Sequence, residues 1–162
     1  MASRPEQLYE EDFYAWTRDQ ARALRQLAAT GPNVDLDLPH LIEEVADLGI
    51  GQRDMVRSQV RRIIEHCLKL EYSPAPAPRA GWHETIIDAR IVLEDKLTPT
   101  LRRGLRRRLP KLYEQARRAV AGSLRVHGEL TAADALPSEC PYRLADLLRH
   151  DWHPPSRHGL TP

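Results

Sequence analysis

The chain has 162 residues, a net charge of +1 and 41% hydrophobic residues, a composition that suits one compact domain and excludes a largely disordered protein. No apolar run reaches the roughly 18 to 20 residues of a membrane span, and the opening MASRPEQLYEEDF has acidic residues where a signal peptide has an apolar core. We therefore predict a soluble cytoplasmic protein whose two cysteines stay reduced.

Apolar residues at helical spacing dominate the first half of the chain. Such a pattern over residues 11–29 predicts a helix, and TGPNVDLDLP then predicts a turn in which Asp35 or Asp37 caps the next helix. From residue 42 to residue 70 one apolar stripe keeps its phase through Gly49 and Gly51. This predicts one long helix over 38–71, weakened or kinked near the glycines, with a break there as the alternative.

Prolines divide the second half of the chain. SPAPAPRAG (73–81) predicts an extended connector, and a helix follows over 82–98. Thr98 before Pro99 is typical of a helix start, and the leucine stripe from residue 101 to residue 124 predicts the next helix, kinked or restarted at Pro110. A short helix is predicted from Pro141 or Tyr142 to about residue 149.

No segment alternates apolar and polar residues over a strand's length, so the predicted fold class is all-α. We expect a single-domain helical bundle with one long helix and short connecting helices. The predicted boundaries are a flexible N-terminus over 1–8, one domain over 9–154 and a disordered tail over 155–162.

Three stretches together resemble a known family: LYEEDFYAWTRDQARALR, then LIEEVADLGIGQRDMVRSQVRRIIEHCLKLEY, then LPSECPYRLADLLRHDW near the end. The chain resembles DUF29, a bacterial family of unknown function, over roughly residues 8–154. The opening YEEDFYAWT and the closing ECPY are the most specific parts. The resemblance implies an all-helical fold and supplies no activity.

Cys140 is a candidate nucleophile, metal ligand or structural residue. Glu139 beside it raises the expected thiol pKa, and no second cysteine or nearby histidine completes a redox or catalytic motif. Pro141 suits the first turn of a helix. We therefore interpret Cys140, Pro141 and Tyr142 as a structural clasp that begins the last helix.

The best candidate metal ligands are histidines and carboxylates on predicted helices. Helical bundles hold metals with Glu-x-x-His pairs on facing helices, but this chain has only the reverse order, with His40 ahead of Glu43 and Glu44. His66 and His83 complete the candidate set. Hydrogen bonds between helices are the favoured interpretation, so no cofactor is expected.

The run RRGLRRR concentrates positive charge at Arg102, Arg103, Arg106, Arg107 and Arg108. Residues 1–50 carry ten acidic residues against four arginines, so salt bridges to this acidic region, or simple solvation, are the favoured interpretation. Nucleic-acid binding through 102–118 is the alternative, although the net charge of +1 is low for that function.

Aromatic residues such as Trp16 and Trp82 lie at predicted helix ends, where core packing and clamping of those ends are expected. Arg90 is predicted to be buried and to pair with Glu43 or Glu44.

No complete catalytic set is present, so the main hypothesis is a non-enzymatic helical module that binds another protein or itself. A metal-dependent enzyme and a nucleic-acid binding protein are the alternatives. No membrane partner is expected.

Overall fold

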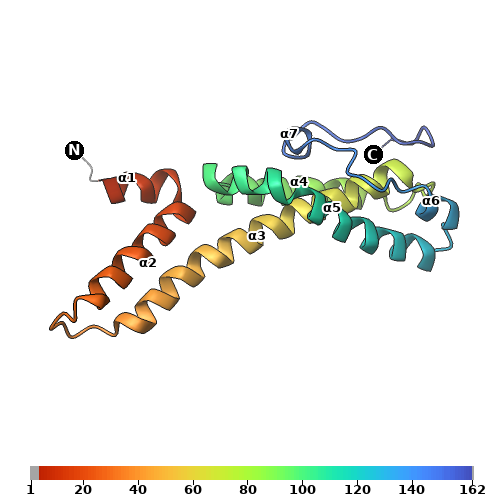
Figure 1. Ribbon diagram of the computed structural model, residues 1–162. Helices are drawn as coiled ribbons and strands as arrows, with labels where there is room; N and C mark the ends of the chain where they lie inside the picture. Colours follow the sequence, from red (N-terminus) through yellow and green to blue (C-terminus); the bar gives the residue numbers. More distant parts are fainter. Residues whose placement is uncertain (1–3, 162) are drawn as a thin grey trace. The chain divides into compact units, whose positions relative to one another are not determined.

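The computed structural model describes residues 4–161, and seven α-helices and no strand are found in that range (Figure 1). The predicted all-α fold is confirmed. None of these helices is long and apolar enough to cross a membrane. The helices are α1 (Arg4–Glu11), α2 (Phe13–Ala29), α3 (Leu38–Tyr72), α4 (Arg79–Lys96), α5 (Pro99–Val126), α6 (Leu130–Asp134) and α7 (Leu144–Leu147).

The described chain groups into two compact units. Unit 1 comprises residues 4–56 and Leu97–Arg103, and unit 2 comprises Arg57–Lys96 and residues 104–161. Helices α3 and α5 each contribute residues to both units.

In unit 1, Asp12 joins three helix ends. Its backbone N–H donates to the Leu8 carbonyl at 2.9 Å, which closes the last turn of α1. Its carboxylate accepts the Ala15 N–H at 3.0 Å as the N-cap of α2, and the Thr100 N–H at 2.8 Å in the first turn of α5. A buried carboxylate is stable here because backbone N–H groups at two helix starts satisfy it.

Helix α3 is a single helix, as predicted, and Asp37 accepts the His40 N–H at 3.3 Å at its start. The alternative of a break at the glycines is wrong. Within unit 1, a Cβ added to Gly49 would collide with the Thr17 hydroxyl of α2, whereas a Cβ on Gly51 would meet nothing within 4 Å. Gly49 is therefore explained by a close approach of α2 and α3 rather than by a helix end.

Helix α5 begins as predicted, because the Thr98 hydroxyl accepts the Leu101 N–H at 3.3 Å ahead of Pro99. The predicted restart at Pro110 is wrong, since the helix runs through this residue. Pro110 and Arg106, whose carbonyl loses its helical donor, are both exposed, so water can satisfy that carbonyl. The helix ends at Val126, and Gly128, two residues later, has the positive φ of +78° typical of a glycine that follows a helix.

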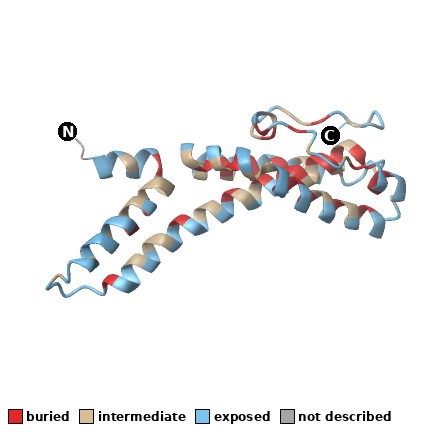
Figure 2. Cartoon of the chain, viewed as in Figure 1, coloured by how far each residue is buried: buried red, intermediate tan, exposed pale blue. Residues whose placement is uncertain are grey.

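The hydrophobic core lies in unit 2, along the second half of α3, α4 and α5 (Figure 2). Of the buried apolar residues among 4–161, only Ala21, Leu38, Val56 and Leu101 belong to unit 1. The last helix, α7, begins at Leu144 after the N-cap Arg143, so the predicted start at Pro141 or Tyr142 is wrong by two or three residues.

Candidate functional site

Arg90 is the most buried charged side chain of unit 2, with 1% of its surface exposed. Its guanidinium donates to three backbone carbonyls of the C-terminal segment: Leu147 at 2.9 Å, His150 at 3.1 Å and Trp152 at 2.8 Å. The predicted burial is confirmed, but the predicted pairing with Glu43 or Glu44 is wrong. Arg90 instead satisfies carbonyls that α7 and the following turn leave without helical donors.

Glu71, near the end of α3, is a second anchor for the C-terminal segment. Its carboxylate accepts the Tyr142 hydroxyl at 2.7 Å and the Arg157 guanidinium at 3.3 Å, and its carbonyl accepts the Arg157 N–H at 2.9 Å. Burial and the neighbouring Glu71 charge raise the pKa of Tyr142, so the phenol stays protonated and donates. The Tyr142 ring also contacts Trp152, with centroids 5.7 Å apart.

The tail predicted to be disordered over 155–162 is held in place over its described part, residues 155–161. Buried Arg79 donates to the Leu70 carbonyl at 2.9 Å and to the Thr161 carbonyl at 2.8 Å. His158 lies 3.0 Å from the Tyr72 carbonyl, and the Arg157 guanidinium stacks over the Tyr72 ring. The prediction failed because loop composition does not reveal partners more than 80 residues away. Residue 162 lies outside the described residues.

Cys140 lies in the C-terminal segment that Glu71 and Arg90 anchor, and its thiol is not activated as a nucleophile. Its thiol donates to the Tyr142 carbonyl at 3.4 Å, and burial raises its pKa. The predicted direction of the pKa shift is confirmed, but its main cause is burial rather than Glu139. The predicted role of Cys140, Pro141 and Tyr142 in beginning the last helix is wrong, because α7 begins at Leu144. ECPY precedes the helix start and attaches the segment to Glu71, while the N-cap Arg143 makes no capping side-chain bond.

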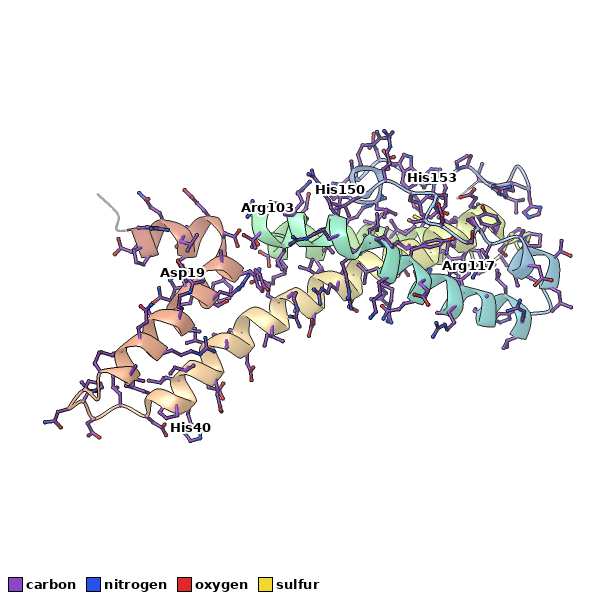
Figure 3. All side chains as sticks on the ribbon, viewed as in Figure 1. Asp19, His40, Arg103, Arg117, His150 and His153 are labelled. Carbon is purple, nitrogen blue, oxygen red and sulfur yellow. The ribbon has the colours of Figure 1, made fainter. Side chains whose placement is uncertain are left out.

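The five candidate metal ligands do not converge. Within residues 4–161, no group of three or more His, Cys, Asp or Glu side chains is arranged to hold a metal ion. His40, at the start of α3, is exposed and binds the Asp37 carboxylate at 2.6 Å (Figure 3). Glu43 and Glu44 are also exposed, and they lie in unit 1, whereas His66 and His83 lie in unit 2.

Two histidines of unit 2 are held in the neutral form. Burial, with the charges of Lys69 and Arg62, lowers the pKa of His66 to about 4, and its Nδ1 has no partner in the described chain. Burial also lowers the pKa of His83, whose ring meets that of His153 edge-on with centroids 5.4 Å apart. Among residues 4–161, neither His66 nor His83 forms a hydrogen bond or an ion pair with a carboxylate.

Trp16 and Trp82 make local contacts near the starts of α2 and α4, and their clamping of helix ends stays a prediction. Trp16 contacts Phe13 and Tyr9 around the α1–α2 corner, with ring centroids 5.6 and 4.9 Å apart. Trp82 is half-buried in the first turn of α4, with the Lys69 ammonium 5.9 Å from its ring centroid.

On α5, Arg102, Arg103, Arg106 and Arg107 are exposed and Arg108 is half-buried. The helical period places the first four within about 140° of one another. Arg103 donates to the Thr100 hydroxyl at 2.9 Å. Both favoured interpretations of the run, solvation and salt bridges to residues 1–50, stay predictions.

Unit 1 exposes a row of large apolar side chains on α3: Leu41, Leu48 and Met55 are 39%, 56% and 42% exposed. A spacing of seven residues returns to the same face of a helix with a drift of about 20°. Of the large apolar side chains exposed among residues 4–161, only Ile87, Ile91, Val126 and Leu130 lie in unit 2. Most of the exposed large apolar side chains among residues 4–161 therefore lie in unit 1, and three of them form this row.

These features define an all-helical protein whose distinctive motifs anchor chain segments to one another. The chain belongs to the family described as domain of unknown function DUF29, which matches residues 8–153. A crystal structure of an α-helical protein of unknown function from Rhodospirillum rubrum is similar, with a TM-score of 0.76 and 26% identity over 89% of this chain and 90% of that one. No curated protein matches the chain.

Sequence reasoning missed Asp12, Glu71 and Arg79. Asp12 lies inside the YEEDFYAWT motif, and Glu71 lies in the LEY that ends the long helix. Both stretches carry the family resemblance, which was the available signal that these two residues matter. Arg79 follows three prolines and carries no such signal.

Proposed function

We propose that this protein is a non-enzymatic helical interaction module, and that its partner is a second copy of the same chain. The observation that carries the proposal is the row formed by Leu41, Leu48 and Met55 on α3, in the unit that buries few apolar residues. Exposed apolar helical faces of this kind mark association surfaces.

The row suits antiparallel packing about a two-fold axis. Leu48 lies at its midpoint, so a second α3 running the other way would place Leu48 beside its own copy and Leu41 beside Met55. The row is about 21 Å long at 1.5 Å per residue, which is enough for an antiparallel helix pair. Gly51 flanks it, and nothing lies within 4 Å of the position of its missing Cβ, so a second helix could approach closely there.

The chemistry of unit 2 supports a role without catalysis. The Cys140 thiol has a raised pKa, burial raises that of Cys67 to about 12, and His66 has a pKa of about 4. Both thiols therefore stay protonated and His66 stays neutral near neutral pH. We also propose that the protein acts in the cytoplasm of a bacterium, because its cysteines are unpaired and the similar crystal structure comes from Rhodospirillum rubrum.

Analytical ultracentrifugation of Leu48→Glu against Ile91→Glu tests this proposal. Ile91 on α4 is a matched control because it is 54% exposed and lies in unit 2. We expect a dimer for the wild type and for Ile91→Glu, and a monomer for Leu48→Glu. A wild type that is monomeric at all concentrations would refute self-association. A monomeric Ile91→Glu variant would indicate that the interface lies on α4 instead.

Disulfide trapping tests the two-fold arrangement itself. Leu48→Cys should form a disulfide-linked dimer under mild oxidation, whereas Leu41→Cys should not, because its predicted neighbour is Met55. The native thiols do not interfere, since Cys67 is buried and Cys140 is half-buried with a raised pKa. Efficient linkage through Leu41→Cys instead would indicate a different register.

A second candidate function is nucleic-acid binding through 102–118, favoured by the four exposed arginines on one face of α5. It predicts salt-sensitive retention on heparin that is lost when Arg106, Arg107 and Arg108 become alanine. Unchanged retention of that triple variant would remove this candidate.

A further inference from the structure

A groove with a volume of about 520 Å³ lies between α2 and the first half of α3, entirely within unit 1. Its nine lining residues include four arginines and no aspartate or glutamate. The arginines are Arg18, Arg22 and Arg25 from α2 and Arg53 from α3. This concentration of guanidinium groups is unexpected in the acidic half of the chain.

Two of these arginines are already neutralised. Arg22 pairs with Asp19 at 2.7 Å, and Arg53 pairs with Asp54 at 2.9 Å (Figure 3 labels Asp19 on α2). Among residues 4–161, neither Arg18 nor Arg25 forms an ion pair. The groove therefore carries about two uncompensated positive charges, which match a phosphate dianion.

The rest of the groove is apolar or aromatic. Tyr14 lies at its edge with the Arg18 guanidinium 5.8 Å from the ring centroid, and Ala21, Ala46, Gly49 and Ile50 complete the lining. A volume of this size lies within the range of small-molecule sites. The lining suits a molecule with an anionic end and a flat, less polar body.

The groove is distinct from the proposed self-association row. On α3, the groove-lining positions Gly49, Ile50 and Arg53 lie about 150° around the helix from the row of Leu41, Leu48 and Met55. Occupancy of one face leaves the other accessible, so this inference does not depend on the proposed function.

We propose that the groove binds a small organic phosphate of nucleotide size. Arg18 and Arg25 bind the phosphate oxygens, and the planar part of the ligand packs against Tyr14 and Ile50. Arginine suits this role because its planar guanidinium donates two parallel hydrogen bonds to phosphate. Arg22 and Arg53 also line the groove, and each donates a hydrogen bond to a neighbouring aspartate, Asp19 and Asp54 respectively.

Isothermal titration calorimetry with ATP and with inorganic pyrophosphate tests the proposal on the full chain. We expect ATP to bind more tightly than pyrophosphate, because pyrophosphate lacks the planar body, and both affinities to fall as salt rises. Arg18→Gln/Arg25→Gln should weaken ATP binding at least tenfold. Both residues are exposed, and an unchanged circular dichroism spectrum would show that the double variant folds.

The matched control is Arg106→Gln/Arg107→Gln, which removes two exposed arginines from α5. It should leave ATP affinity within about twofold of the wild type. Failure of the wild type to bind either probe would overturn the proposal, as would an equal loss in both double variants, which would indicate nonspecific attraction to surface charge. Equal affinities for ATP and pyrophosphate would refute the role of Tyr14 and Ile50.

Discussion

The two units of this chain reach stability by different means. Unit 2 encloses a core formed by α3, α4 and α5, and its C-terminal segment is attached by Arg79, Arg90 and Glu71. Unit 1 contributes only Ala21, Leu38, Val56 and Leu101 to the buried apolar residues among 4–161. The difference indicates that unit 2 is stabilised by its own core and anchoring hydrogen bonds, whereas unit 1 buries few apolar side chains, as expected if the proposed second copy covers part of its surface.

The largest expected effect comes from removing the anchor of the C-terminal segment. Arg90→Ala leaves three carbonyls without their donor, and hydrogen bonds to charged groups contribute about 1.5 to 3 kcal/mol each, so we expect a loss of at least about 3 kcal/mol. Arg90→Lys should recover only part of this loss, because a single ammonium cannot reproduce the three-way geometry. Urea unfolding measures both variants.

A loss below about 1 kcal/mol for Arg90→Ala would contradict the claim that Arg90 anchors unit 2. Limited proteolysis tests whether the C-terminal segment detaches first. We expect the Arg90→Ala variant to be cleaved after residue 144 before the rest of the chain is cut. Simultaneous cleavage throughout would mean that the segment and the core unfold together.

A smaller effect is expected where α2 and α3 meet in unit 1. Gly49→Ala forces a Cβ against the Thr17 hydroxyl and should destabilise the protein by about 1 to 3 kcal/mol. Gly51→Ala is the matched control, because its Cβ meets nothing and alanine favours the helix by about 0.5 to 1 kcal/mol. Thermal unfolding should therefore shift in opposite directions for the two variants. Equal shifts would mean that α2 and α3 do not pack at Gly49.

The smallest expected effect is the pH dependence of the Asp12 corner. Burial tends to raise the pKa of Asp12, but hydrogen bonds from the backbones of Ala15 and Thr100 outweigh it and lower the pKa. A lowered native pKa contributes stability that is present above the unfolded value of about 3.9 and is lost as pH falls through the native value. Asp12→Ala should therefore lose stability at neutral pH and show a flatter acid dependence than the wild type.

Acid unfolding followed by circular dichroism between neutral pH and pH 2 compares the two proteins. Parallel curves for wild type and Asp12→Ala would show that other carboxylates determine the acid response.

The sequence predicted those features that depend on local patterns. Helical periodicity located the long α3 through both glycines, and Thr98 with Pro99 identified the start of α5. Contacts between distant residues could not be predicted in this way. The partners of Arg90 are 57 to 62 residues away and are backbone carbonyls, which no side-chain pattern marks.

The same limit explains the errors at candidate sites. His40, Glu43 and Glu44 share a helix with His66, yet more than twenty residues of helix separate them, so the shared helix did not bring them together. The groove of unit 1 is lined by arginines 18, 22, 25 and 53, which are scattered in sequence, and the close approach of α2 and α3 at Gly49 could not be read from a sequence pattern.

Hydrogen–deuterium exchange at several protein concentrations tests most directly whether unit 1 relies on a second copy of the chain. We predict that amides of residues 38–56 become more protected as concentration rises, while those of 60–72 keep the same slow exchange. Leu48→Glu should abolish the concentration dependence. Identical exchange of 38–56 at all concentrations would contradict the account.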